Sequence, residues 1–403
     1  MQLNLIDDVN HLLPVAGIQL ATAAAGISYS DRTDLALIEI SDGSSVAAVF
    51  TQNAFCAAPV TIAKQHLSKA TPKYLLVNAG NANAGTGQAG LDSATACCKA
   101  IASEMNCKSE EVLPFSTGVI GENLPVDKIK TVIPDLKLDL NPHHWLAASN
   151  AIMTTDTVPK GFSCQVSIAN QIVTITGIAK GVGMIRPDMA TMLAYITTDA
   201  KIEEPLLSQC LKNAADASFN RITVDGDTST NDACVLVATG QSNVAISELN
   251  VKEFQVALNE VAESLAKALI RDGEGATKLI TIKVSGAENS NESDRVAYTV
   301  AHSPLVKTAF FASDPNWGRI LAAVGRAGVK DLDIDKLKIF LNDVCIVENG
   351  GRSSTYNEEL GQQVMNEVEI TINIQLDRGE VSSTIWTCDF SYDYVKINAE
   401  YRS

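Results

Sequence analysis

Apolar side chains recur every three to four positions in three stretches of the chain, which is the spacing of one face of an α-helix. These stretches are 92–105, 203–218 and 251–270. In the second, Pro205 lies in the expected first turn, where proline is tolerated. We therefore predict three helices with core-facing residues Ala94, Cys97, Ile101 and Met105; Leu207, Cys210, Leu211 and Ala214; and Phe254, Leu258, Val261, Leu265 and Leu269.

Shorter runs of β-branched and aliphatic residues indicate strands between these helices. The clearest runs are 46–49, 74–77, 192–197 and 279–284. Apolar positions also alternate on both sides of Ala169 and Asn170, which predicts a β-hairpin over 165–177 that turns at this pair. Strands that are interspersed with helices indicate a mixed α/β protein.

The 403 residues are too many for one hydrophobic core, because single cores stop growing near ~250–300 residues. The segment GAENSNESD at 286–294 is the most polar and breaker-rich part of the chain, so we place a domain boundary there. We predict a main catalytic domain at 1–285 and a smaller α/β domain at 286–403. No apolar run is long enough to span a bilayer.

The charge of the chain narrows the classes of partner. The net charge is −16 and no basic block occurs, so nucleic-acid binding, which needs clustered Lys and Arg, is excluded. The segment 12–26 has the composition of a signal-peptide core, but Asp7 and Asp8 precede it and the first basic residue is Arg32. A signal peptide needs a positive flank. We interpret this segment as an entry strand and turn of a cytoplasmic protein.

The cysteines and histidines favour neither a disulfide framework nor a metal site. Nine cysteines occur without a CxxC pair, which indicates a reducing compartment and small buried hydrophobic side chains. The five histidines show no HExxH or other metal-ligand spacing, and no GxSxG motif is present. A zinc enzyme and a Ser-His-Asp hydrolase are therefore unsupported.

The stretch KGVGMIRPDMATMLAYITT at 180–198 joins a loop with glycines and a proline to a run typical of a buried strand. If the bond between Ala190 and Thr191 stays intact, Thr191 is an ordinary strand residue. If it breaks, Thr191 carries both a hydroxyl and a free α-amine, a nucleophile with its own base. A strained peptide would let the hydroxyl attack the preceding carbonyl in an N-to-O acyl shift, followed by hydrolysis.

Four other segments carry candidate chemistry, each with a plainer alternative. Residues 116–118 place a hydroxyl and an N–H at a predicted turn. These groups can form an oxyanion hole, or the turn can simply end a strand. The hydroxyls at 154–157 can hold a polar ligand or cap their own backbone. Glu274, between two glycines, can receive an ammonium group or remain a solvated acid. The run at 78–87 lacks both nucleotide-binding glycine patterns, so we expect a tight loop beside a pocket.

Seven segments, in order over essentially the whole length, carry a resemblance to a known family. They are NAGNANAGTG at 78–87, FSTGVIG at 115–121, KGVGMIRPDMATMLAYITTDA at 180–200, FNRITVDGDTSTND at 219–232, RDGEGATK at 271–278, SDPNWGRI at 313–320 and YVKINAEYRS at 394–403. On these segments the chain resembles the ornithine acetyltransferase (glutamate N-acetyltransferase) family of arginine biosynthesis.

The resemblance implies an α/β (α+β) fold with an N-terminal-nucleophile-like, layered αββα architecture and a smaller C-terminal α/β domain. It also implies autocleavage between Ala190 and Thr191, after which Thr191 takes the acetyl group of N2-acetylornithine and passes it to glutamate without a cofactor. Thr117 and Gly118 match the oxyanion-hole pair. The family's substrate-contacting positions match Thr154, Lys180, Thr191, Glu274, Asn398 and Ser403. The usual assembly of this family is α2β2.

Elementary chemistry agrees with these roles. Amino-acid substrates need a cation for their carboxylate and an anion for their amine, which Lys180 and Glu274 can supply. Lys180 can also depress the pKa of the new α-amine towards that of a useful base. Three tyrosines near the chain end, Tyr392, Tyr394 and Tyr401, predict that this tail is packed and completes the active site.

Two other functions stay open at this point. A related N-terminal-nucleophile amidase or aminopeptidase would pass its acyl group to water instead of glutamate. A binding protein with an intact chain would have no cleavage at all. Members of the family that the chain resembles also divide into exchange-only enzymes and bifunctional ones, so acetyl-CoA is a possible second donor.

Overall fold

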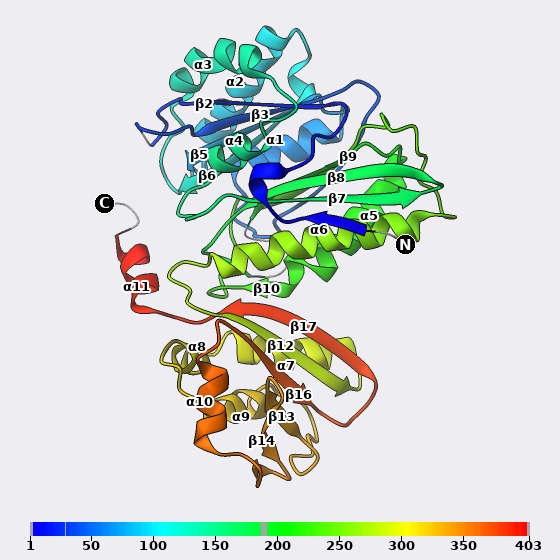
Figure 1. The fold of residues 1–403 in the computed structure, drawn as a ribbon. Helices are drawn as coiled ribbons and strands as arrows, with labels where there is room; N and C mark the ends of the chain where they lie inside the picture. The colour runs from blue at the N-terminus through cyan, green and yellow to red at the C-terminus, as the bar shows by residue number, and fades with distance from the viewer. Residues whose placement is uncertain (1–2, 29, 187–191, 401–403) are drawn as a thin grey trace. The chain divides into compact units, whose positions relative to one another are not determined.

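The computed structural model describes residues 3–28, 30–186 and 192–400, and these form three β-sheets with helices packed on them (Figure 1). The chain divides into two units. The N-terminal unit comprises Met1–Asn220 and Asp227–Leu269, and the C-terminal unit comprises Arg221–Gly226 and Ile270–Ser403. The mixed α/β class predicted from the sequence is confirmed.

A six-stranded sheet of the N-terminal unit has the order β1-β7-β8-β9-β11-β4. Its strands are β1 (Leu3–Ile6), β7 (Lys160–Ile168), β8 (Gln171–Lys180), β9 (Leu193–Thr198), β11 (Ala233–Ala238) and β4 (Ser45–Phe50). The neighbours pair antiparallel except β9 and β11, which are parallel. Between β7 and β8, Ala169 and Asn170 both have positive φ, as a tight two-residue turn requires, so the predicted hairpin is confirmed.

A four-stranded sheet of the same unit has the order β2-β3-β5-β6. Its strands are β2 (Ile18–Ala23), β3 (Leu35–Ile40), β5 (Tyr74–Asn81) and β6 (Val112–Val119). β5 and β6 are parallel, and the other neighbours are antiparallel. Residues 116–118, predicted as a turn, lie inside β6 instead, because the parallel pairing with β5 continues through them.

The two sheets face each other across a shared hydrophobic core. The four-stranded sheet contributes Ile38 and Val77, and the six-stranded sheet contributes Ile178, Tyr195 and Val235. Side chains of a strand alternate between its two faces, so the remaining face of each sheet is free to take helices. This core fixes how the ends of β6 and β8 lie relative to each other, which matters for the site below.

Helices cover the outer face of each sheet, which gives the αββα layering that the family resemblance implied (Figure 1). α2 (Gly87–Met105) and α3 (Val126–Asp139) pack on the four-stranded sheet. α6 (Val251–Arg271) packs on β8, where a Cβ added to Gly177 would lie 3.0 Å from Leu265 Cδ1. The other helices of this unit are α1 (Ala58–Leu67), α4 (Trp145–Ala151), α5 (Glu204–Ala217) and the short 3₁₀ turns η1 (Val9–His11), η2 (Ser109–Glu111) and η3 (Phe219–Arg221, which ends in the C-terminal unit).

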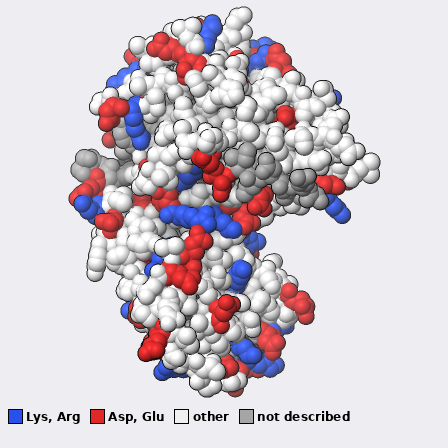
Figure 2. All heavy atoms as spheres, viewed as in Figure 1, with Lys and Arg blue, Asp and Glu red and all other residues white. Residues whose placement is uncertain are grey.

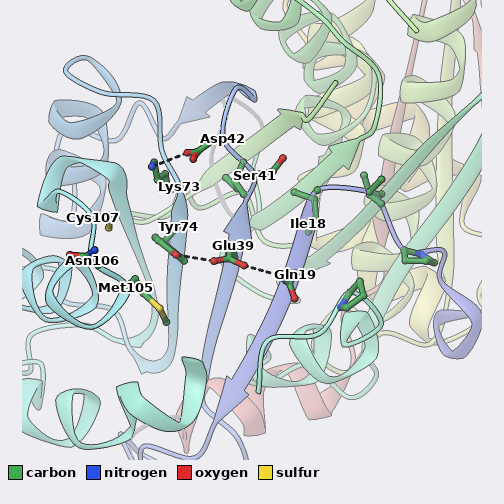
Figure 3. Close-up of a pocket in the computed structure, with 16 residues that line it drawn as sticks. Ile18, Gln19, Glu39, Ser41, Asp42, Lys73, Tyr74, Met105, Asn106 and Cys107 are labelled. Atoms are coloured by element: carbon green, nitrogen blue, oxygen red, sulfur yellow. Dashed lines mark hydrogen bonds and ion pairs between the residues drawn. The ribbon is translucent and has the colours of Figure 1, made fainter. Parts of the chain in front are cut away.

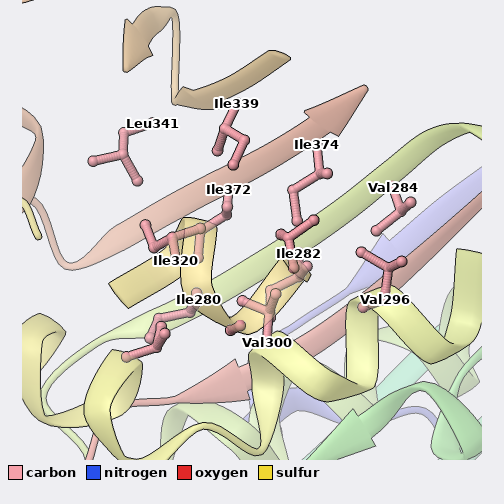
Figure 4. Packing of buried hydrophobic residues seen from close by; sticks show 14 of the residues in the cluster. Ile280, Ile282, Val284, Val296, Val300, Ile320, Ile339, Leu341, Ile372 and Ile374 are labelled. Carbon is pink, nitrogen blue, oxygen red and sulfur yellow. The ribbon is translucent and has the colours of Figure 1, made fainter. Parts of the chain in front are cut away.

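The C-terminal unit is built on a seven-stranded mixed sheet. Its strands, in spatial order, are β10 (Ile222–Thr223), β17 (Val381–Cys388), β12 (Leu279–Ala287), β16 (Glu369–Gln375), β13 (Lys338–Leu341), β14 (Val344–Glu348) and β15 (Gly351–Arg352). Ile282 and Ile372 on adjacent strands pack with Val300 and Ile320 from two helices in a mainly aliphatic core (Figure 4). The helices are α7 (Ser290–Ala301), α8 (Pro304–Phe311), α9 (Trp317–Gly325), α10 (Glu358–Met365) and α11 (Tyr392–Ala399).

In the structure the continuous part of the C-terminal unit begins at Ile270, which is earlier in the chain than the boundary predicted at 285/286. β12 pairs with β16 and β17 and so belongs to the C-terminal unit. The breaker-rich segment after it begins α7, and Asn289 caps this helix by accepting a 3.0 Å hydrogen bond from the N–H of Glu292. Ser and Asn initiate helices as readily as they occur in linkers, which is why composition misplaced the boundary.

No helix in the described ranges is both long and apolar enough to cross a bilayer. All nine cysteines are free thiols, and six of them are buried. Acidic and basic side chains are scattered among uncharged ones on the visible face of each unit, so the net charge of −16 is spread over the surface there (Figure 2).

Candidate active site

Lys180 binds two other residues that the sequence analysis singled out. Its Nζ donates hydrogen bonds to Thr117 Oγ1 at 3.0 Å and to Thr154 Oγ1 at 2.9 Å. The lysine is the last residue of β8, where it pairs with Leu193 at the start of β9. Ile178, two residues earlier, points into the core between the sheets, and the strand period directs Lys180 the same way, towards β6. The structure therefore brings Lys180, Thr117 and Thr154 into direct contact.

Asp156 lies next to this lysine and was not singled out by the sequence analysis. Its carboxylate accepts hydrogen bonds from Lys160 Nζ at 2.8 Å and from the N–H groups of Thr154 (3.1 Å) and Gly181 (2.9 Å). Lys180 Nζ lies 3.9 Å from its second oxygen. The Asp156 and Lys160 side chains are both fully buried. This carboxylate thus fixes the loop that carries Thr154 and the backbone just after β8.

The charge state of Asp156 follows from these partners. Burial alone would raise the pKa of its carboxyl. The positive charges of Lys180 and Lys160, together with the hydrogen bonds from Lys160 and from the Gly181 N–H, outweigh burial and lower the pKa to about 2. Asp156 is therefore ionised at neutral pH, with two ammonium groups around it.

Gly118 on β6 has a backbone that no other residue can adopt there. Its φ is +130°, and a Cβ at this position would lie 2.2 Å from the carbonyl carbon of Gly80 on β5. The close approach of the two strands explains why residues 116–118 remain in the sheet instead of turning away. Because Gly118 has no side chain, residue 118 also leaves the backbone beside Thr117 uncovered.

A network of asparagines holds this part of β6. Ser116 Oγ donates to Asn78 Oδ1 at 2.5 Å, and Asn78 Nδ2 donates to the carbonyl of Asn81 at 2.8 Å. From the segment before β11, Asn231 Nδ2 donates to the carbonyls of Ser116 (2.9 Å) and Ala82 (2.6 Å). The polar residues of 78–87, expected to form a loop, thus lie partly in β5 and serve as supports for residues 116–118.

Asp232 is a second buried carboxyl that sequence reasoning missed. It directly precedes β11, next to Met192, whose carbonyl accepts a 3.1 Å hydrogen bond from the Ala233 N–H. Its Oδ2 is buried and has no hydrogen-bond partner within the described residues. Burial raises the pKa of this carboxyl well above its ordinary value, although Ser229, the charge of Lys180 and the Met192 backbone act in the opposite direction. The sequence did contain a signal for a buried Asp232, namely a run of polar residues that ends where the all-apolar strand β11 begins.

The C-terminal unit contains another pair of the predicted residues. Asn398 Nδ2, on α11, donates a 2.8 Å hydrogen bond to Glu274 Oε2. Glu274 is buried, and its neighbour Gly275 has a φ of +67° with no room for a Cβ, which would lie 2.5 Å from Ser391 Oγ. The solvated loop acid considered from the sequence is therefore wrong for Glu274, because α11 and the segment before it pack over this loop.

The expectation of a packed tail needs correction. Tyr392 is 84% exposed, and α11 has no fully buried residue. Tyr394 does pack, since its ring stacks on Phe390 with centroids 4.7 Å apart. Ala190, Thr191, Tyr401 and Ser403 lie outside the described residues, and so does the predicted cleavage bond.

A cavity of about 680 Å³ lies in the N-terminal unit away from all of these residues (Figure 3). Its polar wall consists of side chains that already bind one another. Glu39 accepts from Tyr74 Oη and Gln19 Nε2, both at 2.8 Å, and Lys73 pairs with Asp42 at 2.8 Å. The volume alone does not make it the reactive centre, because the perturbed carboxyls Asp156 and Asp232 do not line it.

The fold and the site define an α/β enzyme with an αββα core and a buried Lys-Thr-Asp cluster between its sheets. Within this class, the chain belongs to the ArgJ family, whose model matches residues 19–403. It is 56% identical over 395 residues to the arginine biosynthesis bifunctional protein ArgJ of Methylococcus capsulatus, with 97% of each chain covered.

Two solved structures are also similar. The arginine biosynthesis bifunctional protein ArgJ of Bacillus halodurans is 38% identical, covers 51% of this chain and 98% of its own, and has a TM-score of 0.49. The ornithine acetyltransferase of Mycobacterium tuberculosis, solved with ornithine, is 34% identical, covers 46% of this chain and 99% of its own, and has a TM-score of 0.43.

Proposed function

We propose that this protein transfers the acetyl group of N2-acetylornithine to glutamate, giving ornithine and N-acetylglutamate, as a step of arginine biosynthesis. The names of its relatives support this activity, since the curated ones are arginine biosynthesis bifunctional proteins and a solved one is an ornithine acetyltransferase. The observation that carries the proposal is the Lys180 ammonium bound to both Thr117 and Thr154, directly before the segment that contains Thr191.

The proposed nucleophile is Thr191, freed by self-cleavage after Ala190. Its hydroxyl oxygen attacks the acetyl carbonyl of N2-acetylornithine, the amide C–N bond breaks, and ornithine leaves with the proton from the hydroxyl. The acetyl ester on Thr191 is then attacked by the amine of glutamate, which restores the hydroxyl. The α-amine of Thr191 serves as the base in both halves.

Each half passes through an oxyanion, for which we propose Thr117 and Gly118. Hydrogen-bond donors that are fixed before the reaction stabilise such a charge without reorganising. The Gly80–Gly118 approach and the asparagine network hold this stretch of β6 rigidly, which supports the role. Lys180 adds a positive charge beside Thr117, in a region where few water molecules compete.

The charges of Lys180 and Glu274 determine which group of the substrate each of them would bind. Lys180 and Thr154 suit the carboxylate of a substrate. Among the described residues, the ammonium groups of Lys160 and Lys180 surround one carboxylate, that of Asp156, so the local charge favours a bound anion. Glu274, oriented by Asn398, suits an amino group of the substrate. Ser403 completes the set that we propose for substrate contact.

One experiment tests the activity and its alternatives together. Purified protein is incubated with [acetyl-¹³C]N2-acetylornithine with and without glutamate, and the products are identified by NMR. We expect labelled N-acetylglutamate in place of free acetate. Acetate as the main product in the presence of glutamate would instead favour a hydrolase, and no turnover of either kind would favour a binding protein. A parallel reaction of glutamate with acetyl-CoA decides whether the chain has the second donor.

Chain processing and assembly are tested on the same sample. Intact-mass measurement should give two chains, 1–190 and 191–403, and Thr191→Ala should give one inactive chain. Native mass spectrometry should then show two copies of each chain, the α2β2 assembly. An active Thr191→Ala variant would eliminate Thr191 as the nucleophile.

A further inference from the structure

Asp389 lies directly after β17, and its side chain holds the loop that precedes β12. Its Oδ1 accepts hydrogen bonds from the N–H groups of Thr277 at 2.8 Å and of Lys278 at 2.9 Å. Its Oδ2 accepts a third hydrogen bond from Thr277 Oγ1 at 2.5 Å. Only 1% of the residue is exposed. Hydrogen bonds to a carboxylate are stronger than those between neutral groups, so Asp389 fixes the end of this loop.

The loop and Asp389 meet because β12 and β17 are antiparallel neighbours. The paired residues of the two strands end at Leu279 and Cys388. The residues just outside the pair, Lys278 and Asp389, therefore leave the sheet side by side. The three hydrogen bonds of the Asp389 side chain continue the connection between the two segments beyond the end of the paired strands.

Glu274 lies in a tight turn directly before the residues that Asp389 binds. The Ala276 N–H donates a 2.8 Å hydrogen bond to the Gly273 carbonyl, which makes Glu274 and Gly275 the central residues of the turn. The φ of +67° at Gly275 suits such a turn. Because the turn is short and closed, fixing its end at Thr277 also fixes the Glu274 backbone.

The two residues that follow Asp389 place the helix that carries Asn398. Ser391 caps α11 by accepting a 3.3 Å hydrogen bond from the Tyr394 N–H, and the Phe390 ring stacks on that of Tyr394. The start of α11 also packs directly on the turn, since a Cβ at Gly275 would lie 2.6 Å from the Tyr394 nitrogen. One short segment thus determines the position of both the turn and the helix.

A buried lysine holds the same segment from α8. Lys307 is 1% exposed, and its Nζ donates hydrogen bonds to Thr387 Oγ1 at 2.8 Å and to the Cys388 carbonyl. The same ammonium group lies 4.5 Å from the centroid of the Phe390 ring, within the range of a cation–π interaction. Residues 387–391 are therefore held on two sides, and a side chain that they carry is placed precisely.

We propose that Asp389 is a positioning residue for the amino group of the substrate. It holds Glu274 through the turn and, through the segment that follows it, Asn398 on α11, which binds the Glu274 carboxylate at 2.8 Å. This inference rests on the proposed function, in which Glu274 receives the amine of N2-acetylornithine. A carboxylate that is ordered before the substrate arrives binds it more tightly, because little conformational freedom is lost on binding.

The test measures KM and kcat for N2-acetylornithine at saturating glutamate. Asp389→Ala removes all three acceptor contacts, so we expect the KM to rise about 10- to 100-fold with kcat little changed. Asp389→Asn keeps one oxygen for the two N–H groups, and its amide can donate to Thr277 Oγ1. The KM of this conservative variant should stay near the wild-type value. A KM as high as that of Asp389→Ala would mean that the charge of Asp389 attracts the amine directly, which would overturn a positioning role.

The matched control is Glu292→Ala, at the other end of β12. Glu292 is also a buried acid, 6% exposed, and it accepts hydrogen bonds from Arg378 Nε at 3.1 Å and from the Glu288 N–H at 3.4 Å. Its loss should lower the Tm, as that of Asp389 should, but leave the KM unchanged. An equal rise in KM in the control would show that the KM merely follows stability, and the proposal would be wrong.

A double-mutant cycle separates positioning through Glu274 from a structural effect. If Asp389 acts through Glu274, adding Asp389→Ala to Glu274→Gln should raise the KM by less than about twofold, because the contact that Asp389 supports is already lost. Effects that multiply would show two independent contributions and would overturn the proposal.

The remaining outcomes distinguish this inference from the proposed function. Wild type that does not turn over N2-acetylornithine defeats both, and so does an unchanged KM in Glu274→Gln. A raised KM in Glu274→Gln with an unchanged KM in Asp389→Ala defeats the positioning role alone. If Asp389→Ala does not fold, Thr277→Val decides, because it removes only the hydroxyl contact with Asp389. A rise in its KM of about threefold or more supports the role, and an unchanged KM overturns it.

Discussion

Lys180 donates a 3.0 Å hydrogen bond to Thr117 and so connects β8 of the six-stranded sheet to β6 of the four-stranded sheet. The two residues are far apart in the sequence, and neither has a local motif that predicts the other. The connection is possible because the two sheets share one core, which sets the ends of β6 and β8 at hydrogen-bonding distance.

We expect Lys180→Met to remove this connection while leaving the apolar part of the side chain in place. In the Thr191→Ala background the variant should lose about 2–3 kcal/mol of unfolding free energy in urea, the range for a buried hydrogen bond to a charged group. In the active protein kcat/KM should fall by about 10²-fold. The control is Lys137→Met, whose partly exposed pair with Glu104 at 3.2 Å is worth about 0–1 kcal/mol. Equal stability of the two variants would contradict the prediction.

Asp156 should make the protein sensitive to acid. Its folded pKa of about 2 lies below the ordinary value of 3.8, so its contribution is complete above pH 3.8 and is lost as the pH falls towards 2. The shift corresponds to about 2 kcal/mol at neutral pH. Asp156→Asn should therefore be less stable than its parent at pH 7, and the difference should shrink between pH 4 and pH 2. Urea unfolding across this range measures it, and a difference that is independent of pH would refute the assignment.

Gly118→Ala should unfold or strongly destabilise the protein. The added Cβ would lie 2.2 Å from backbone carbon, which no rotamer change relieves, and φ is +130°. We expect a loss of about 4 kcal/mol or more, in the exceptional range for a single substitution. Gly121→Ala is the matched control on the same segment, with φ at +87° but no atom within 4 Å of the new Cβ. That variant should lose only about 1–2 kcal/mol from backbone strain. Similar thermal denaturation curves for the two would argue against the clash.

Glu274→Gln should act on substrate binding more than on turnover. The amide oxygen can still accept the hydrogen bond from Asn398, so only the charge is removed. We expect the KM for N2-acetylornithine to rise roughly 10- to 100-fold, as for loss of a hydrogen bond to a charged group, with kcat little changed. Glu288→Gln, a surface acid paired with Arg378, should leave both constants unaltered. An unchanged KM in the first variant would mean that Glu274 does not hold the amine.

Local patterns predicted the elements whose stability is local. The apolar stripe of 251–270 corresponds to α6, where Phe254, Leu258 and Leu265 are fully buried. The hairpin at Ala169 and Asn170 is in place because two consecutive positive φ angles close a tight turn by themselves. Such features depend on a period or on a turn, and both are written in neighbouring residues.

Predictions failed where the decisive partner lies elsewhere in the chain. Residues 116–118 were predicted to form a turn. They remain in β6 because Gly80 on the neighbouring strand β5 allows the close approach of Gly118. The polar segment at 286–294 was predicted to mark a domain boundary, yet part of it caps and begins α7. For Glu274 the sequence left a solvated acid as one alternative, yet Asn398 binds its carboxylate. In each case the composition of the segment was compatible with two environments, and a distant contact selected one.

Patterns along the chain were enough to predict the mixed α/β class, the main helices and the hairpin, and to select candidate residues around 117, 154, 180 and 274. The folded chain was needed to show that Lys180 binds Thr117 and Thr154, that Asp156 is ionised next to it, and that Asp232 is buried beside Met192. Hydrogen bonds and pKa values depend on the distance between groups and on their burial. These are set when two sheets close over a common core, and spacing along the chain does not contain them.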